Sequence, residues 1–128
     1  MAGVYIHIPF CRQACLYCNF HFSTSLRFKN DLINALLKEI AITPFYNNKN
    51  AIETVYFGGG TPSLLPAAQL KAVLDTLHRK FIISDTAEIT LEANPDDISA
   101  LQLATWRKMG INRLSIGVRS FFEEDLQW

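Results

Sequence analysis

The sequence predicts an α/β fold in which about four strands form a parallel sheet and about three helices connect them. Short segments that alternate apolar with other residues are separated by longer segments whose apolar residues recur every three or four positions. Loops rich in cysteine, glycine or proline follow the strand-like segments. In α/β barrels the carboxyl ends of the strands carry the functional groups, so these loops are expected to form the site.

The first strand is expected over residues 4–8, with Tyr5 and His7 on the same face, and Pro9 ends it. Tyr5 is equally well interpreted as a site residue or as an ordinary core aromatic, because its position in a strand does not separate these two roles. His7 is taken as structural, since a lone histidine is a weak signal.

All three cysteines of the chain, Cys11, Cys15 and Cys18, follow directly and fall within eight residues. Thiolates are preferred ligands of zinc and of iron-sulfur clusters. A [4Fe-4S] cluster held by three cysteines keeps one iron open to a small chelating molecule. A structural zinc needs a fourth ligand, for which His21 is the best placed candidate. An odd number of cysteines argues against a disulfide, and simple burial does not explain why all three lie in one loop.

Helical periodicity begins at Ser25 and ends before Pro44, and a second helix is expected shortly after Pro66. Each helix has one apolar stripe with the spacing of a core-facing surface. The stripes are Ile33, Leu36, Leu37 and Ile40 in the first helix, and Leu70, Val73, Leu74 and Leu77 in the second.

Two further strands are expected over residues 54–57 and 88–95, and a fourth over 113–118. Asp96 and Asp97 are interpreted as the start of a third helix, and Gly110 as its carboxyl-terminal cap.

The second strand runs into the sequence Gly-Gly-Gly-Thr-Pro, residues 58–62. Glycines without side chains let a ligand rest directly on the main chain. The segment is not a phosphate-binding P-loop, because no Lys-Ser/Thr pair follows the last glycine. Taken alone, it is more simply a tight turn. Glu92, near the end of the third strand, offers a carboxylate to a ribose or an amine, or is a solvated strand-end charge.

The segment from Tyr5 to Cys11, together with the Cys-x3-Cys-x2-Cys loop, resembles the opening of the radical S-adenosylmethionine (SAM) proteins. More narrowly, it resembles the branch that contains oxygen-independent coproporphyrinogen III oxidases and HemW heme chaperones. In that family the amino and carboxylate groups of SAM chelate the open iron of a [4Fe-4S] cluster. Electron transfer from the cluster then cleaves SAM to a 5′-deoxyadenosyl radical.

The resemblance implies a role for each matching position. Arg119 departs from the family, which usually has glutamine there, so its expected role is to pair with a carboxylate of SAM or of a substrate. The cluster ligands implied are Cys11, Cys15 and Cys18, and the SAM contacts implied are Tyr5, Tyr17, Gly59, Gly60, Thr61 and Glu92.

The two groups of the branch differ after the third cysteine. The oxidases carry a further cysteine two positions later, where this sequence has Phe20. This difference favours a HemW-like heme chaperone and leaves open whether the protein is an enzyme. The alternatives are an oxygen-independent coproporphyrinogen III oxidase and a zinc-stabilised structural domain. The implied partners are heme or a porphyrinogen, an electron donor and a heme-acceptor protein.

The chain has 128 residues, whereas a full (β/α) barrel takes about 250. Residues 1–128 are therefore expected to be the amino-terminal part of a radical SAM core domain, truncated before the rest of the barrel and a carboxyl-terminal domain. Such a part is expected to expose the edge of its last strand and the apolar faces meant for missing helices, which predicts poor solubility or association.

Composition limits the classes of partner. Twelve basic and twelve acidic side chains give a formal net charge of zero, which argues against a nucleic-acid partner. No leader peptide or membrane-length apolar run is evident. Clustered thiols without a secretion signal are typical of a reducing cytoplasm, where we expect the protein to be located.

Overall fold

The computed structural model describes residues 1–11, 27–44, 50–118 and 120–126. Within them, four parallel strands form one sheet in the order β1-β2-β3-β4. The strands are β1 (Ala2–Ile8), β2 (Ile52–Gly59), β3 (Ile83–Ala93) and β4 (Arg113–Ile116). The helices are α1 (Lys29–Ile42), α2 (Ala67–Lys80) and α3 (Ala100–Lys108), with short 3-10 turns η1 (Pro62–Leu64), η2 (Pro95–Asp97) and η3 (Glu123–Leu126).

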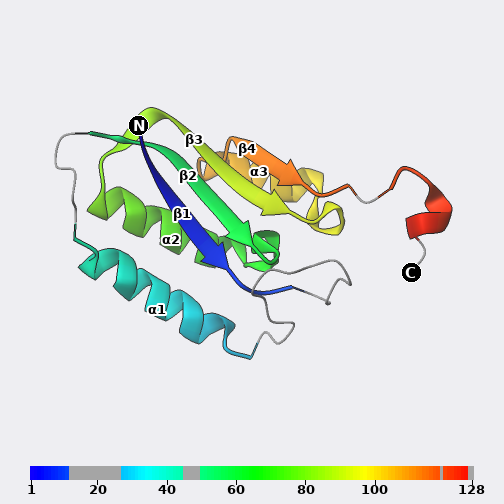
Figure 1. Ribbon diagram of the computed structural model, residues 1–128, viewed down its shortest axis with the longest axis horizontal. Coiled ribbons are helices and arrows are strands. Elements are labelled where there is room, and N and C mark those ends of the chain that lie inside the picture. Colours follow the sequence, from blue (N-terminus) through cyan, green and yellow to red (C-terminus); the bar gives the residue numbers. More distant parts are fainter. Residues whose placement is uncertain (12–26, 45–49, 119, 127–128) are drawn as a thin grey trace.

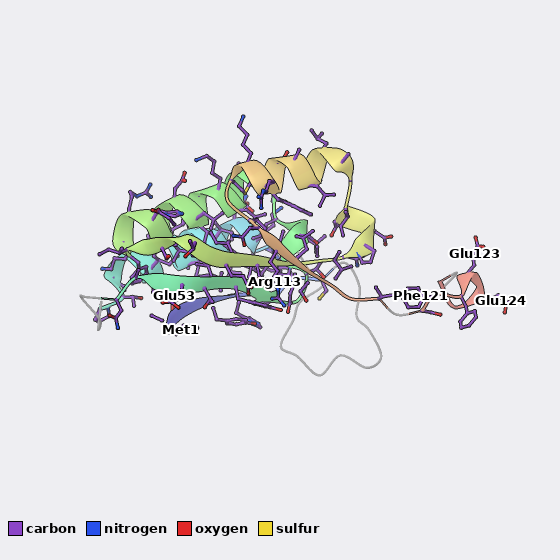
Figure 2. The ribbon with its side chains drawn as sticks, turned by 90° about the horizontal axis from the view of Figure 1, so that it is seen from above. Met1, Glu53, Arg113, Phe121, Glu123 and Glu124 are labelled. Atoms are coloured by element: carbon purple, nitrogen blue, oxygen red, sulfur yellow. The ribbon has the colours of Figure 1, made fainter. Side chains whose placement is uncertain are left out.

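The helices pack on one side of the sheet (Figure 1). Figure 2 shows the same layering from above, with no helix of the described residues on the other side of the sheet. Strands that follow one another in the sequential order, with all helices on one side, are the arrangement of a (β/α) barrel opened along its length. The predicted parallel α/β fold, with four strands and three helices, is confirmed.

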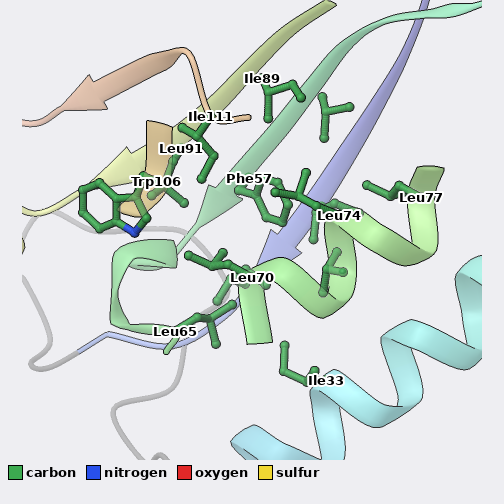
Figure 3. Close-up of a cluster of buried hydrophobic side chains, with 14 of the residues drawn as sticks. Ile33, Phe57, Leu65, Leu70, Leu74, Leu77, Ile89, Leu91, Trp106 and Ile111 are labelled. Carbon is green, nitrogen blue, oxygen red and sulfur yellow. The ribbon is translucent and has the colours of Figure 1, made fainter. Parts of the chain in front are cut away.

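The core lies between the sheet and the helices, because each strand presents alternate residues to this side. Phe57 and Leu91 of the central strands are fully buried in the core cluster, where Phe57 lies beside Leu74 of α2 (Figure 3). Leu70, Val73, Leu74 and Leu77 form the buried face of α2, as the helical spacing predicts. Burial of each such side chain stabilises the fold by about 1.5–3 kcal/mol.

The third helix begins later than the sequence suggests. Asp96 and Asp97 lie in the 3-10 turn η2, and α3 starts at Ala100. Its amino-terminal cap is Ser99, whose hydroxyl accepts a hydrogen bond from the Gln102 amide at 3.1 Å. The interpretation of the two aspartates as helix-start residues was therefore wrong, because Ser99, two residues after Asp97, takes the capping position.

The other end of α3 agrees with the prediction. Gly110 has φ of +108°, a left-handed conformation that glycine adopts without strain. The amide of Ile111 donates to the Trp106 carbonyl at 3.0 Å, and that of Gly110 donates to Arg107 at 3.1 Å, which closes the helix end.

Asn112 then aligns β4 with β3. Its side-chain oxygen accepts from the Ile89 amide at 2.8 Å, and its amide nitrogen donates to the Ala87 carbonyl at 2.9 Å. The resulting register places Ser115 beside Glu92.

The last strand, β4, forms one edge of this sheet, and several apolar side chains near it are exposed. Phe121 is 92% exposed and lies on a segment that extends away from the sheet (Figure 2). The exposed edge and apolar residues agree with the sequence expectation, whereas association of the chain stays a prediction. No helix in the described part of the chain combines the length and apolar character that crossing a bilayer requires.

Candidate functional site

The carboxyl ends of β1, β2 and β3 meet at the same end of the sheet, because the three strands are parallel. This end is the carboxyl edge of the sheet and is distinct from the lateral edge formed by β4. Main-chain hydrogen bonds extend the contact between β1 and β2 beyond their ends. The Gly60 amide donates to the Ile8 carbonyl at 2.7 Å, and the Thr61 amide donates to the Phe10 carbonyl at 2.6 Å. The start of the cysteine loop and the glycine segment therefore lie side by side, as expected for loops at the same end of parallel strands.

Glycine is required at two positions of this segment. Gly59 has φ of +112°, and a Cβ atom there would approach the His7 ring to 2.9 Å. A Cβ atom on Gly60 would collide with the Phe10 carbonyl oxygen and would lie 2.9 Å from the Sγ of Cys11. The close approach of the two loops thus depends on the absent side chains, and it brings the thiol of Cys11 against the glycine segment.

Glu92 lies at the same edge, half-buried, and each oxygen of its carboxylate accepts one hydrogen bond. The Tyr56 hydroxyl donates to Oε1 at 2.7 Å, and the Gly59 amide donates to Oε2 at 3.1 Å. A carboxylate can accept about four hydrogen bonds, so Glu92 keeps acceptor capacity for a ligand that carries donors.

The amides of Gly59, Gly60 and Thr61 all donate to acceptors within the protein. A phosphate or other anion would need such amides as donors. An ammonium group donates only, so it would use carbonyl and carboxylate oxygens instead. The segment therefore suits an amine better than an anion, in agreement with the sequence argument against a P-loop.

Tyr5 and Tyr56 stack on the face of the sheet that no described helix covers. Their ring centroids are 6.0 Å apart with an interplanar angle of 20°, and Tyr5 is 58% exposed. The Tyr5 hydroxyl lies 3.1 Å from Nδ1 of His7, which confirms that these two residues share a strand face. Burial, together with the nearby charge of Glu92, raises the pKa of Tyr5 above its usual 10.0.

A buried hydroxyl connects the loops that follow β2 and β3. Ser63, in η1, is 5% exposed. Its hydroxyl donates to Oδ2 of Asp97 at 2.6 Å and accepts from the Asn94 amide at 3.1 Å. This pair of hydrogen bonds holds η1, which follows the glycine segment, against η2, which follows the strand of Glu92.

Sequence reasoning missed Tyr56, Ser63 and Asp97 as contributors to this region. For Tyr56 a signal existed, because strand alternation places it on the same face as Gly58 and opposite to Phe57. Ser63 and Asp97 are 34 residues apart, and no local pattern connects them.

The predicted site residues fall into two groups. The structure brings Tyr5, Cys11, Gly59, Gly60, Thr61 and Glu92 to one edge and the adjoining open face. Cys15, Cys18, Tyr17, Arg119 and the alternative zinc ligand His21 lie outside the described residues. Among the described residues no group of three metal-binding side chains occurs, so the predicted cluster rests on two cysteines beyond them.

The described residues nevertheless fit a [4Fe-4S] cluster with bound SAM. A thiol, the preferred ligand of iron-sulfur clusters, faces a segment that only glycine can form. Beside it stands a carboxylate with acceptor capacity for the amine or the ribose hydroxyls of SAM. A separate hollow of 230 Å³ between α3 and β4, lined mainly by Leu103, Trp106, Ile111 and Leu114, contains none of these residues.

Comparison with known proteins identifies the family. The model of the radical SAM superfamily matches residues 5–128. The chain is 39% identical over 128 residues to the heme chaperone HemW of Escherichia coli K12 and 41% identical to HemW of Bacillus subtilis 168. Each alignment covers 98% of this chain and 34% of the relative. The chain thus spans about one third of the length of these curated relatives.

A solved structure agrees with this result. The coproporphyrinogen III oxidase HemN from Escherichia coli, a radical SAM enzyme, superimposes with a TM-score of 0.86 at 33% sequence identity. The match covers 96% of this chain and 29% of HemN. With both the sequence model and the fold in agreement over nearly all of its length, the chain belongs to the radical SAM superfamily.

Proposed function

We propose that this chain is the [4Fe-4S]- and SAM-binding part of a HemW-like heme chaperone, and that residues 1–128 are the amino-terminal part of its radical SAM core domain. The observation that carries the proposal is the meeting of Cys11, the glycine segment and Glu92 at one sheet edge. The identity to HemW proteins over nearly the whole chain supports the narrower assignment.

Cys11, Cys15 and Cys18 would hold the cluster, which supplies an open iron for SAM and an electron for its reductive cleavage. The segment from Gly59 to Thr61 and the carboxylate of Glu92 bind and orient the amine and ribose donors of SAM. Tyr5 and Tyr17 would line the SAM pocket. Arg119 would pair with a carboxylate of SAM or of a substrate.

The second candidate is the cluster-binding part of an oxygen-independent coproporphyrinogen III oxidase. The structural match to HemN favours it, and the Phe20 position, which lacks the further cysteine of the oxidases, argues against it. The two functions differ in what happens to the tetrapyrrole.

The deciding experiment uses the cluster-loaded protein under anaerobic reducing conditions with SAM. One sample receives coproporphyrinogen III and is assayed for decarboxylated product, and a second receives heme and is then mixed with a heme-free acceptor protein. A chaperone binds and transfers heme and leaves the porphyrinogen unchanged. Decarboxylation without heme binding would replace the chaperone by the oxidase.

A zinc-stabilised structural domain is the third candidate and makes a different prediction for His21. Zinc would need this histidine as its fourth ligand. His21→Ala would then abolish metal binding, whereas a three-cysteine cluster would survive the change. Metal and sulfide analysis of the wild type and the variant separates the two.

The partners follow from the proposed chemistry. An electron donor would reduce the cluster, and a heme-acceptor protein would receive the heme. Three ligating thiolates need a reducing compartment, which supports a cytoplasmic location.

A further inference from the structure

Tyr56 makes the shortest contact to the carboxylate of Glu92, yet neither the cluster nor the SAM assignment includes it. We propose that Tyr56 is a positioning residue of the SAM site, which fixes the carboxylate of Glu92 through its hydroxyl and supports Tyr5 through its ring. The inference rests on the proposed function, since it assigns a role at the same site.

The carboxylate of Glu92 is held at both of its oxygens. A glutamate side chain has three rotatable bonds, so a single hydrogen bond leaves its second oxygen free to turn. Here the Tyr56 hydroxyl holds Oε1 at 2.7 Å and the Gly59 amide holds Oε2 at 3.1 Å. Because each oxygen has its own donor, the two hydrogen bonds together define the plane of the carboxylate. Each is also about twice as strong as a hydrogen bond between neutral groups, because the acceptor is charged.

Tyr56 must itself be held in place in order to position another group. Its ring stacks on Tyr5, the partner residue in the β1–β2 register. Both rings lie over Gly58, where a Cβ atom would approach Tyr56 Cε1 to 2.8 Å and Tyr5 Cε2 to 2.9 Å. Gly58 therefore makes room for the tyrosine pair, whereas Gly59 and Gly60 allow the close approach of the glycine segment to the start of the cysteine loop.

The hydroxyl of Tyr56 must also keep its proton in order to donate it. The hydrogen bond to Glu92, with partial burial, raises the pKa of Tyr56 above its usual 10.0. The hydroxyl therefore remains a donor throughout the physiological pH range. Each oxygen of Glu92 already accepts one hydrogen bond from the protein, so its remaining acceptor sites are available to donors on a ligand.

The test compares Tyr56→Phe with wild type in cluster-loaded protein. Phenylalanine keeps the ring and removes only the hydroxyl. Thr54→Val is the matched control, because Thr54 lies two residues earlier on the same face and pairs with Glu88, four residues before Glu92. Each protein is analysed for iron and sulfide, for melting temperature, and for the dissociation constant of SAM by titration of the cluster's electron paramagnetic resonance signal.

We expect Tyr56→Phe to weaken SAM binding by between about threefold and about tenfold, which is the net contribution of one ordinary hydrogen bond. The effect is smaller than for a bond made directly to SAM, because the hydroxyl acts on SAM only through Glu92. Cluster content should stay unchanged, and Thr54→Val should bind SAM as wild type does. In Glu92→Ala, which removes both acceptor oxygens, the further change Tyr56→Phe should have little additional effect, because the tyrosine acts through the glutamate.

Wild-type affinity in Tyr56→Phe, or additive effects of the two changes, would overturn the positioning role and leave the proposed function intact. A wild-type protein that carries its cluster and binds no SAM would remove the proposed function and this inference together. A lowered cluster content in Tyr56→Phe would assign the tyrosine to folding of the cluster loop and would also overturn the inference.

Discussion

The hydroxyl of Tyr56 donates a hydrogen bond of 2.7 Å to the carboxylate of Glu92 across two neighbouring strands of the sheet. Tyr56 lies within β2 and Glu92 near the end of β3, so the bond connects the middle of one strand to the functional edge of the next. Because both strands are anchored by the buried core, the carboxylate is held by the fold rather than by a loop.

The first prediction concerns the ionisation of Tyr56. Its pKa is raised chiefly by the hydrogen bond to Glu92, and next by burial. Glu92→Gln should therefore lower the pKa of Tyr56, because the charged acceptor is gone. The measurement is an alkaline titration of tyrosinate absorbance, and the difference between wild type and Tyr56→Phe isolates this residue among the four tyrosines. An unchanged titration in Glu92→Gln would contradict the hydrogen bond.

The same shift makes a prediction for stability against pH. The folded state holds the Tyr56 proton more tightly than the unfolded chain, whose pKa is 10.0. The resulting stabilisation is complete below this value and is lost as the pH rises through the higher folded-state pKa. Above pH 10, wild type should therefore lose stability more steeply than Tyr56→Phe, as measured by urea unfolding. If the free energy of unfolding fell equally steeply with pH in the two proteins, the raised pKa of Tyr56 would be contradicted.

The next prediction concerns the close approach of the two loops. Gly60→Ala places a Cβ atom against the Phe10 carbonyl and near the thiol of Cys11. Because the Phe10 carbonyl also accepts the Thr61 amide, the backbone there has little freedom to move. We expect a loss of about 1–3 kcal/mol in the free energy of unfolding and a reduced yield of reconstituted cluster.

Gly117→Ala is the control for this change, since a Cβ atom there meets nothing within 4 Å. It should keep the iron and sulfide content of wild type. Equal cluster content in Gly60→Ala and Gly117→Ala would show that the spacing between the loops does not matter for the cluster.

A further prediction tests the bond between the loops after β2 and β3. Ser63→Ala leaves the Asn94 amide and the Asp97 carboxylate without the buried hydroxyl that connects them. The expected cost is about 1–3 kcal/mol in the free energy of unfolding, measured by urea denaturation. Ser84→Ala is the control, because the Ser84 hydroxyl makes local hydrogen bonds to Thr86 of the same strand. This change should alter the free energy of unfolding by less than about 0.5 kcal/mol. A similar cost in both variants would remove the special role of Ser63.

Periodicity predicted the parts of the fold that burial determines. The stripe from Leu70 to Leu77 faces the core, and Tyr5 shares an exposed strand face with His7, because helical and strand spacing decide which side of an element meets the sheet core. The cap at Gly110 was equally readable, since few residues other than glycine adopt its positive φ.

Other features depend on partners that are distant in the sequence. The strand β3 begins at Ile83, five residues before its expected start. The residues directly after Ile83 are polar and do not alternate with apolar residues, so the strand pattern did not predict this part of β3. Asp97 serves as the partner of Ser63 rather than as a helix start, and only the folded chain brings the two together. The sequence pattern does not single out Tyr56, because an aromatic residue in a strand is usually a core residue. Its hydrogen bond reaches Glu92, two residues beyond its register partner Thr90, and is visible only in the folded sheet.

The roles expected for Cys15, Cys18, Tyr17 and Arg119 stay predictions, since these residues lie outside the described part of the chain. The six other site residues lie together, as parallel strands require of groups at their carboxyl ends.

The central claim is that three cysteines hold a cluster with an iron open to SAM. The most direct measurement is anaerobic reconstitution with iron and sulfide, followed by electron paramagnetic resonance of the reduced protein with and without SAM, alongside metal analysis. We predict the signal of a reduced four-iron cluster that changes when SAM is added. Stoichiometric zinc without sulfide, or a cluster whose signal is the same at saturating SAM, would contradict the account.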